Sequence, residues 1–235
     1  MEGATDDQWA EFDSVETIKA MEKALQSAGH TTTFYEADTN VYEKLKKKKP
    51  DICFNIAEGY FGDSRESQIP AILQMLQLPY TGSKILETAI ILDKPLTKRI
   101  WKSYGLSTTS YQVFEKGDEK LNSVLKFPVF VKPAKEGCGK GVSVNSIANN
   151  AAELKKQASF ILKKYKQFAL VEPFLTGREF TIGVIGNRPN QFVFPPMEIN
   201  TTEIAPSEIG VYTYKVNAHI DDVTTYMTIP KLSAK

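Results

Sequence analysis

Three glycines at alternating positions follow a lysine near the middle of the chain. The segment 131–141 is Val-Lys-Pro-Ala-Lys-Glu-Gly-Cys-Gly-Lys-Gly, with the lysine at Lys132 and the glycines at Gly137, Gly139 and Gly141. Glycine tolerates positive φ angles and close approach of its backbone, so successive N–H groups can point at an anion. The pattern predicts a loop that cradles phosphate groups, although an ordinary glycine-rich hairpin tip would have the same composition.

This glycine loop, residues 136–141, lies between two predicted strands. Phe127–Val131 is an apolar run typical of a buried strand, and a segment of alternating apolar residues starts at Val142. The phosphate-binding motifs G-x-x-x-x-G-K-[ST] and G-x-G-x-x-G both need a helix after their glycines. The loop is therefore predicted to belong to neither motif.

A second candidate for nucleotide contact is the segment that begins at Glu172. A predicted strand, Phe168–Val171, continues into Glu172-Pro173-Phe174-Leu175, and Glu179 follows. Because Pro173 has no N–H group, we expect an edge strand or a connection here rather than a central strand. An adenine needs one backbone N–H and one C=O from such a connection, with a carboxylate nearby for the ribose hydroxyls.

Charged residues also follow a predicted strand in the first third of the chain. Asp51–Ala57 has the composition of a buried parallel strand, and Glu58, Arg65 and Glu66 lie in the polar loop after it. Ligands of open α/β sheets bind at the carboxyl ends of strands. These three residues are candidates for holding a zwitterionic substrate, and a solvent-facing loop would explain them about as well.

The elements that position these residues alternate along the chain, which indicates an α/β fold that begins with a small parallel sheet. Lys94 opens a helix where a cation opposes the helix dipole, so we expect it to contact a phosphate. Helices are predicted over a segment capped by Asp13 and ended by Gly29, then Val41–Lys49, Ile69–Leu78, a segment from Ser83 to near Leu92, Leu96–Tyr104 and Ala151–Lys164. Further strands are predicted over Thr31–Ala37, Thr108–Phe114, Thr181–Ile185 and Phe192–Phe194, with a strand and turn over Leu78–Ser83, a hairpin turn at Gly186-Asn187 and a long loop over Thr201–Tyr214.

Composition excludes several classes of function. The 235 residues include 29 Lys and Arg against 28 Asp and Glu, a net charge of +1, which offers no electrostatic reason to expect nucleic acid or a membrane surface as a partner. The sequence has no membrane-spanning apolar run, and its first residues are unlike a secretory signal, so we expect a cytoplasmic protein. Two cysteines and two histidines argue against a disulfide framework and a clustered Cys/His metal site.

Taken in order, these motifs resemble those of the ATP-grasp enzymes, and most closely the D-alanine–D-alanine ligases and their relatives. The resemblance rests on Lys94, on residues 131–141 and on Leu170–Thr181, and segments 54–59 and 65–70 resemble the ligase-related branch. It covers nearly the whole chain. It implies an N-terminal α/β substrate domain over residues 1–93, a central ATP-grasp lobe over 94–176 and the start of a C-terminal lobe, with α+β character, over 177–235.

The resemblance also implies a reaction and roles for residues. ATP would phosphorylate an amino-acid carboxylate, and a second amine would attack the acyl phosphate, as in peptidoglycan synthesis for the cell wall. Lysines and Mg²⁺ would neutralise charge on the transferring phosphoryl group. Lys94 and Lys132 would contact the phosphates, the glycine loop would cover them, the connection from Glu172 to Leu175 would flank the adenine, and Glu179 would bind the ribose. The implied nucleotide-binding set is Lys94, Lys132, Glu136, Gly137, Cys138, Gly139, Gly141, Glu172, Phe174, Leu175 and Glu179.

Three departures from the family pattern shape the expectations. The glycine-rich loop that follows the family's first strand is not in this chain, and the family's Lys-Tyr pair falls at Asn217-Ala218. The Arg-x-Asp and Glu-x-Asn segments that bind magnesium are expected beyond Lys235, so no metal ligand is expected within the chain. The chain is thus expected to be an incomplete and inactive form, with no catalytic residue identified.

Two other functions fit the same motifs. One is a non-catalytic, nucleotide-binding regulatory module, and the other is a different ATP-grasp ligase, related to biotin carboxylase or glutathione synthetase. The Arg65-Glu66-Ser67-Gln68 segment favours the peptide-ligase branch over the latter. The family suggests a homodimer, and the amino acids joined are not determined by the sequence.

Overall fold

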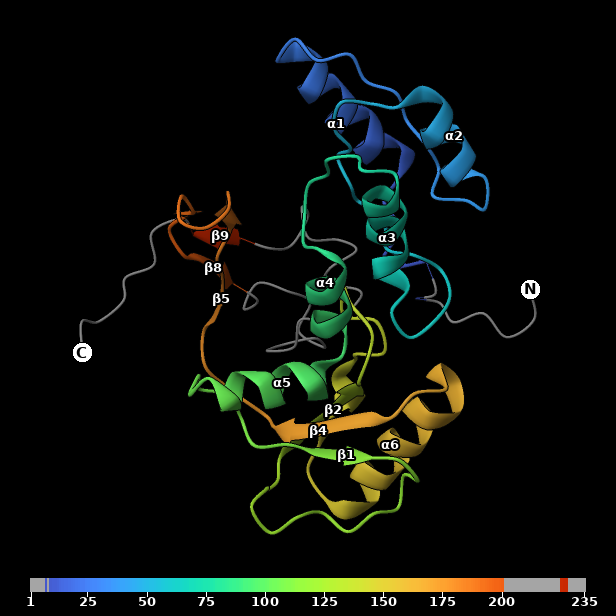
Figure 1. The fold of residues 1–235 in the computed structure, drawn as a ribbon. Coiled ribbons are helices and arrows are strands. Elements are labelled where there is room, and N and C mark those ends of the chain that lie inside the picture. The colour runs from blue at the N-terminus through green and yellow to red at the C-terminus, as the bar shows by residue number, and fades with distance from the viewer. Residues whose placement is uncertain (1–6, 8, 201–224, 228–235) are drawn as a thin grey trace. The chain divides into compact units, whose positions relative to one another are not determined.

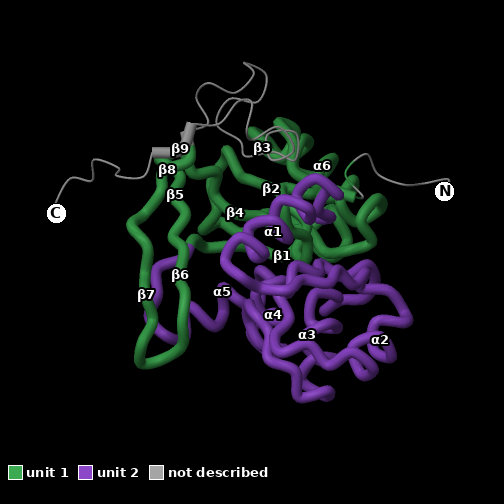
Figure 2. Tube along the Cα trace, turned by 90° about the horizontal axis from the view of Figure 1, so that it is seen from above, with its two compact units in different colours: residues 1–10, 109–235 green, residues 11–108 purple. Residues whose placement is uncertain are grey.

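The computed structural model describes residue 7, residues 9–200 and residues 225–227 (Figure 1). The chain divides into two compact units, one of residues 11–108 and one of residues 1–10 with 109–235 (Figure 2). In the part of the chain that is described, no helix is both long enough and apolar enough to cross a membrane.

Helices make up most of the unit of residues 11–108. They are α1 (Val15–Ser27), α2 (Val41–Lys48), the 3₁₀ turn η1 (Arg65–Ser67), α3 (Gln68–Met75), α4 (Ile85–Leu92) and α5 (Lys94–Ser103). A small core joins Val41 and Leu45 of α2 to Leu73 of α3. Each helix lies close to its predicted position.

The ends of α1 follow the predicted chemistry with one shift. Gly29, at φ +88°, ends the helix as expected, and its N–H donates to the Gln26 carbonyl at 2.9 Å. The N-cap is Ser14, whose hydroxyl accepts from the Thr17 N–H at 3.1 Å, so the prediction of Asp13 was wrong by one residue. The apolar residues from Val15 to Ala28 lie at helical spacing and predict a core-facing helix, but this is also wrong, because no residue of α1 is buried and Val15 is 59% exposed.

The predicted strands of this unit are largely missing. Residues 31–37 form no strand, and within 51–57 the only pairing in the described structure is a parallel bridge from Cys53 to Tyr80. In this bridge the Cys53 N–H donates to the Pro79 carbonyl at 2.8 Å. A strand needs an adjacent strand to pair with its backbone N–H and C=O groups. These segments have the amino-acid composition of strands, but they lack such a partner strand among the described residues. The expected small parallel sheet is thus reduced to one bridge.

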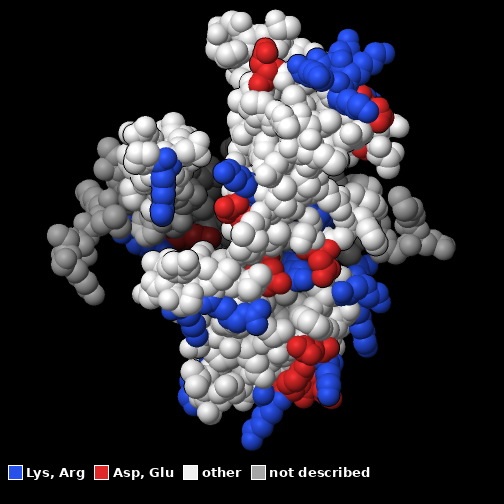
Figure 3. Space-filling view, in the orientation of Figure 1, with Lys and Arg blue, Asp and Glu red and all other residues white. Residues whose placement is uncertain are grey.

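The two helices that precede the sheet unit begin differently. Asp93 caps α5 by accepting from the Leu96 N–H at 2.9 Å, which confirms the predicted start and makes Lys94 the first helical residue. The N-cap of α4 is Lys84 rather than Ser83, and no side chain caps this end. Figure 3 shows Lys and Arg side chains gathered over α2, where Lys46–Lys49 are exposed, in agreement with a solvated face.

A four-stranded antiparallel sheet is the centre of the other unit. Its strands are β1 (Gln112–Phe114), β2 (Val129–Pro133), β3 (Ile147–Ala148) and β4 (Ala169–Pro173), in the order β1-β4-β2-β3. Helix α6 (Ala151–Tyr165) packs against it (Figure 1). The core includes Phe114, Val129 and Val131 from the sheet and Leu154 and Ile161 from α6.

Strand β4 corrects the expectation drawn from Pro173. The strand lies between β1 and β2 and is therefore central, not an edge or a connection. Pro173 is its last residue, opposite Val129, and the next N–H, that of Phe174, donates to the Pro128 carbonyl at 3.1 Å. A proline is tolerated at this end because the ladder no longer needs its N–H.

The segment after the glycine loop also differs from prediction. In place of a strand from Val142, a 3₁₀ turn, η2 (Val144–Ser146), precedes the two-residue strand β3. Ser143 and Ser146 form a reciprocal capping box, with the Ser143 N–H donating to the Ser146 hydroxyl at 3.1 Å. These local hydrogen bonds compete with strand pairing and shorten the strand.

The remaining strands form two further pieces of sheet. Strands β5 (Glu179–Thr181), β8 (Met197–Asn200) and β9 (Thr225–Met227) pair in the order β5-β8-β9, and β6 (Val184–Ile185) pairs with β7 (Phe192–Val193). The predicted strand 181–185 is thus divided, and the turn at Gly186, with φ +85°, is confirmed. The sequence did not predict β8, and the predicted loop 201–214 lies outside the described residues.

Candidate functional site

The face of the sheet opposite α6 carries an ion pair. Side chains alternate along β2, so Val129 and Val131 enter the core while Phe130 and Lys132 lie on the other face. The Lys132 Nζ is 2.6 Å from the Glu172 Oε2. The Thr109 hydroxyl donates to the other oxygen, Oε1, at 2.8 Å. The lysine side chain remains 27% exposed, so its ammonium is oriented by Glu172 and still reaches solvent.

Two aromatic rings lie beside this pair. Phe130 and Phe174 stack with centroids 6.0 Å apart and an interplanar angle of 22°, and the Lys132 Nζ lies 6.0 Å from the centre of the Phe130 ring. Leu175, the next residue, is 67% exposed. A flat apolar surface next to a carboxylate and an ammonium suits a ligand that joins an aromatic base to an anionic group.

The glycine loop consists of two successive tight turns. The Lys140 N–H donates to the Gly137 carbonyl at 2.8 Å, and the Val142 N–H donates to the Gly139 carbonyl at 2.9 Å. Positive φ angles occur at Cys138 (46°), Gly139 (71°) and Gly141 (76°). A Cβ at Gly141 would lie 2.4 Å from the Pro133 Cγ, so this position requires glycine for both its conformation and its space.

Side chains fasten the glycine loop to the start of β4. The Lys140 Nζ is 3.0 Å from a Glu136 carboxylate oxygen, and the Gln167 Nε2 donates to the other oxygen of Glu136. The Gln167 Oε1 in turn accepts from the Lys135 N–H at 2.9 Å. Lys140 is only 14% exposed, so it is held more firmly than a lysine on a free loop. The sequence did not predict the role of Gln167.

Glu179 is electrostatically coupled to Lys132. Partial burial raises the pKa of Glu179, and the positive charge of Lys132 lowers it, with burial the larger effect. The neighbouring Arg178 pairs instead with Glu198 on β8, with its Nε and Nη2 each 2.6 Å from a carboxylate oxygen. The structure therefore places Lys132 beside Glu172 and within electrostatic range of Glu179, and their membership of a single nucleotide site stays a prediction.

Metal ligands are not gathered within the described residues. They include no group of three or more His, Cys, Asp or Glu side chains that could hold an ion. Glu198-Ile199-Asn200 has the Glu-x-Asn spacing, but its carboxylate is bound on both oxygens by Arg178. The described residues thus do not fit a magnesium site, and Asn217-Ala218 lie outside them.

The candidate substrate residues lie in the unit of residues 11–108 and surround a buried ion pair. The Arg65 Nη2 is 2.7 and 2.8 Å from the two carboxylate oxygens of Glu11, with the side chains only 8% and 2% exposed. Burial raises the pKa of Glu58 to about 7, reinforced by the charges of Glu66 and Glu11 and opposed by Arg65. The three predicted residues are therefore close together, whereas Glu11 was not foreseen, because only the fold brings it to Arg65.

Lysines of α5 belong to this same unit. Lys94 is partly buried at the first position of the helix. Lys98, one turn later, is 7% exposed and donates from its Nζ to the Thr108 hydroxyl at 2.7 Å. The sequence pattern did not distinguish Lys98 from an ordinary surface lysine.

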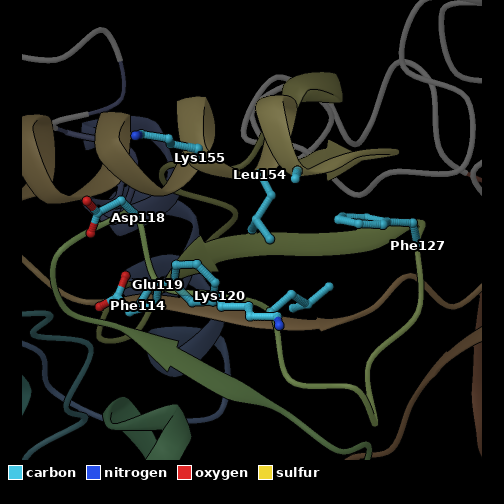
Figure 4. Close-up of a pocket in the computed structure, with 9 residues that line it drawn as sticks. Phe114, Asp118, Glu119, Lys120, Phe127, Leu154 and Lys155 are labelled. Carbon is cyan, nitrogen blue, oxygen red and sulfur yellow. The ribbon is translucent and has the colours of Figure 1, made fainter.

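A hollow of about 400 Å³ lies elsewhere on the sheet unit, between α6 and the segment after β1 (Figure 4). Its lining includes Phe114, Phe127 and Leu154, with charged side chains at its rim. The Glu119 carboxylate there accepts from the N–H groups of residues 115, 116 and 117 at 2.6, 2.6 and 2.8 Å. Burial would raise the pKa of Glu119, but these N–H groups together lower it. None of the predicted site residues lines this hollow.

Comparison with solved structures defines the class of fold. The D-alanine–D-alanine ligase from Bacillus anthracis superposes on 98% of this chain and 70% of its own, with a TM-score of 0.68 and 21% identity. A structure of that ligase complexed with ATP covers 94% of this chain and 68% of its own, with a TM-score of 0.61 and 23% identity. The mixed helix-and-sheet fold is that of the ATP-grasp ligases, which confirms the predicted fold class.

Comparison of sequences defines the family. Residues 100–235 match the family described as D-ala D-ala ligase C-terminus. The D-alanine–D-alanine ligase of Aquifex aeolicus is 34% identical over 203 residues, which are 86% of this chain and 64% of that protein. The ligase of Glaesserella parasuis is 33% identical over 94% of this chain and 68% of its own length. The chain therefore belongs to the D-Ala-D-Ala ligase family, and it spans less than two thirds of the first of these relatives.

Proposed function

We propose that this chain belongs to an ATP-dependent carboxylate–amine ligase of the D-alanine–D-alanine ligase type. The observation that carries the proposal is the Lys132–Glu172 ion pair, which lies beside the stacked rings of Phe130 and Phe174. The glycine loop follows β2, the strand that carries Phe130 and Lys132. The relatives bear the name D-alanine–D-alanine ligase, and the fold matches a ligase that was solved with ATP.

The residues present fit a nucleotide. The glycine loop has the compact backbone of two tight turns, and Lys132 offers a charge whose position Glu172 fixes. Phe174 and Leu175 would flank the adenine and Glu179 would accept hydrogen bonds from the ribose, while a contact of Lys94 with the phosphates is carried over from the family resemblance alone. When bound, ATP supplies the phosphoryl group that activates a carboxylate for attack by an amine.

For the amino-acid substrates, Glu58 is the strongest candidate among the predicted residues. Its pKa of about 7 means that the carboxyl can gain or lose a proton near neutral pH, as a group that binds or deprotonates an ammonium must. Arg65 already holds Glu11 with two close contacts, so we assign it mainly to positioning this loop. Glu66 contributes negative charge to the same cluster.

Magnesium enters the proposal only as a family expectation. The described residues do not gather a carboxylate cluster, so we assign none of them to the ion and derive no step through it. The second candidate, a nucleotide-binding module without ligase activity, uses the same nucleotide contacts. Location in the cytoplasm, a homodimeric state and a role in peptidoglycan synthesis remain parts of the proposal that follow from the family.

Two measurements test the proposed function. Calorimetric titration of the chain with ATP, in the presence of magnesium, should show binding that the Lys132→Ala variant weakens. A phosphate-release assay with D-alanine and ATP then tests for ligase activity. Turnover would support the ligase and contradict the module, binding without turnover is the result expected of the module and of an incomplete ligase chain alike, and a chain that folds but binds no ATP would contradict both.

A further inference from the structure

A carboxylate from the N-terminal segment lies at the end of the glycine loop. The Asp7 Oδ2 accepts a hydrogen bond from the Gly141 N–H at 2.7 Å and a second from the Tyr165 hydroxyl at 2.8 Å. Asp7 is only 7% exposed. Because 134 positions separate Asp7 from Gly141, the contact is a product of the tertiary fold.

The Gly141 N–H is fixed in direction. Gly141 has a φ of +76°, and the Pro133 ring closes the space on its Cα, so the peptide cannot turn freely. Tyr165, the last residue of α6, approaches the same glycine, since a Cβ there would lie 3.2 Å from the Tyr165 Cζ. Gly141 and Tyr165 therefore form a preorganised pair of donors for one oxygen atom.

Such a pair does not distinguish a carboxylate oxygen from a phosphate oxygen. Both are anionic acceptors, and both form short charge-assisted hydrogen bonds with N–H and O–H donors. The two lysines near the loop are likewise engaged by internal carboxylates, Lys132 by Glu172 and Lys140 by Glu136. The chain's own acids thus occupy the donors that suit a phosphate group.

Only one of the two carboxylate oxygens of Asp7 accepts hydrogen bonds from described residues. Its second oxygen, Oδ1, is buried and has no hydrogen-bond partner among the described residues. A buried carboxylate oxygen without a donor costs free energy, since water would have solvated it. The Asp7 contact is therefore easier to displace than a fully bonded buried carboxylate would be.

We propose that Asp7 occupies a phosphate-oxygen position formed by Gly141 and Tyr165, and that the N-terminal segment thereby competes with the triphosphate of a nucleotide. The inference rests on the proposed function and adds regulation to its site. Binding of the triphosphate breaks the two hydrogen bonds to Asp7 and displaces its carboxylate. The Asp7 side chain acts as an internal competitor whose removal strengthens nucleotide binding.

The decisive experiment compares the affinity of ATP for the wild-type chain, Asp7→Ala and Asp118→Asn by calorimetry. Asp118→Asn is the matched control, because it also removes one acidic charge, at an exposed position of the same unit. We expect Asp7→Ala to tighten binding by about fivefold or more, at the low end of typical coupling between two sites, and the control to change it by less than about twofold. Inorganic tripolyphosphate should show the same order, since the competition concerns phosphate oxygens.

A second readout follows the segment itself. Trp9 lies two residues from Asp7, and a Trp101→Phe background leaves it as the sole tryptophan of the two in the chain. Tripolyphosphate should increase acrylamide quenching of Trp9 in this background, and adding Asp7→Ala should give the increased quenching without ligand. This measurement keeps the inference testable if Asp7→Ala alone is poorly folded.

The outcomes separate the inference from the function on which it rests. If the wild-type chain binds ATP and Asp7→Ala binds it equally or more weakly, the competition does not exist while the proposed function stands. Unchanged quenching of Trp9 on saturation with tripolyphosphate leads to the same conclusion. If neither the wild type nor Asp7→Ala binds ATP or tripolyphosphate, both the proposed function and this inference are overturned.

Discussion

Two ion pairs of nearly equal length have different surroundings in the two units. Lys132 and Glu172 lie 2.6 Å apart with side chains 27% and 10% exposed, whereas Arg65 and Glu11 lie 2.7 Å apart with side chains 8% and 2% exposed. A partly exposed pair can exchange one partner for a ligand, because water and the ligand can solvate the charge that is released. A buried pair cannot separate without leaving an unpaired charge in the interior.

The comparison assigns different roles to similar chemistry. Lys132 borders an apolar ring surface and can meet an anion, while Glu172 keeps its position through the Thr109 hydroxyl. Arg65 instead connects Glu11, at the start of its unit, to the loop that holds Glu58. Substitutions in the second pair should therefore affect folding first, and substitutions in the first pair should affect binding first.

The largest effect is expected from the buried pair. Glu11→Ala should lower the free energy of unfolding by about 3 to 5 kcal/mol, because it removes the carboxylate that neutralises the buried Arg65 guanidinium. Asp38→Asn is the control, since it breaks an exposed ion pair. In this pair the Lys44 side chain is 41% exposed and the Asp38 side chain 37% exposed. Denaturant unfolding measures both, and equal midpoints for the two variants would show that the buried pair is not structural.

The next effect concerns nucleotide affinity. Lys132→Ala should weaken ATP binding by about 1.5 to 3 kcal/mol, the scale of a charge-assisted hydrogen bond, and by more than Lys140→Ala. Both lysines pair with a carboxylate, but the Lys140 side chain is only 14% exposed against 27% for Lys132, and Gln167 also holds the Glu136 carboxylate beside Lys140, so Lys132 is more accessible to a ligand. Calorimetry on both variants checks the order, and equal losses would contradict the role given to Lys132.

A third prediction uses the pKa of Glu58. The folded state raises this pKa from 4.5 to about 7, so the folded state binds the proton more tightly than the unfolded state. The contribution of Glu58 to the free energy of unfolding is therefore fully present below pH 4.5 and is lost as the pH rises to about 7. Glu58→Gln should therefore stabilise the chain by about 1 to 3 kcal/mol at pH 8 relative to its effect at pH 4.5. The same stability difference between variant and wild type at both pH values would refute it.

The smallest effect is expected at Glu179. Replacement by Gln should reduce the preference for ATP over 2′-deoxy-ATP by about 0.5 to 1.5 kcal/mol, since an amide is a weaker acceptor for ribose hydroxyls than a carboxylate. Arg178→Gln is the neighbouring control, because Arg178 pairs with Glu198 and not with Glu179. An unchanged preference in Glu179→Gln, measured by competition binding, would assign Glu179 a structural role.

Local chemistry determined much of the fold at the level of sequence. Asp93 at the start of α5, Gly29 after α1 and the apolar spacing of α6 act within one or two helical turns, so their consequences can be foreseen without a partner. The glycine loop and the Lys132 strand end are predictable for the same reason, because their φ angles and strand alternation are local properties.

Tertiary structure alone decided which distant groups meet. Residues 51–57 have a strand's composition but pair only at Cys53 among the described residues, and β4 became central although Pro173 argued otherwise. Glu11 reaches Arg65, and Asp7 reaches Gly141, across separations that no spacing rule covers. Hydrogen-bond partners and burial depend on the packing of segments that are far apart in the chain. A sequence pattern can therefore specify a donor, a charge or a turn, whereas the tertiary fold determines which group that donor or charge contacts.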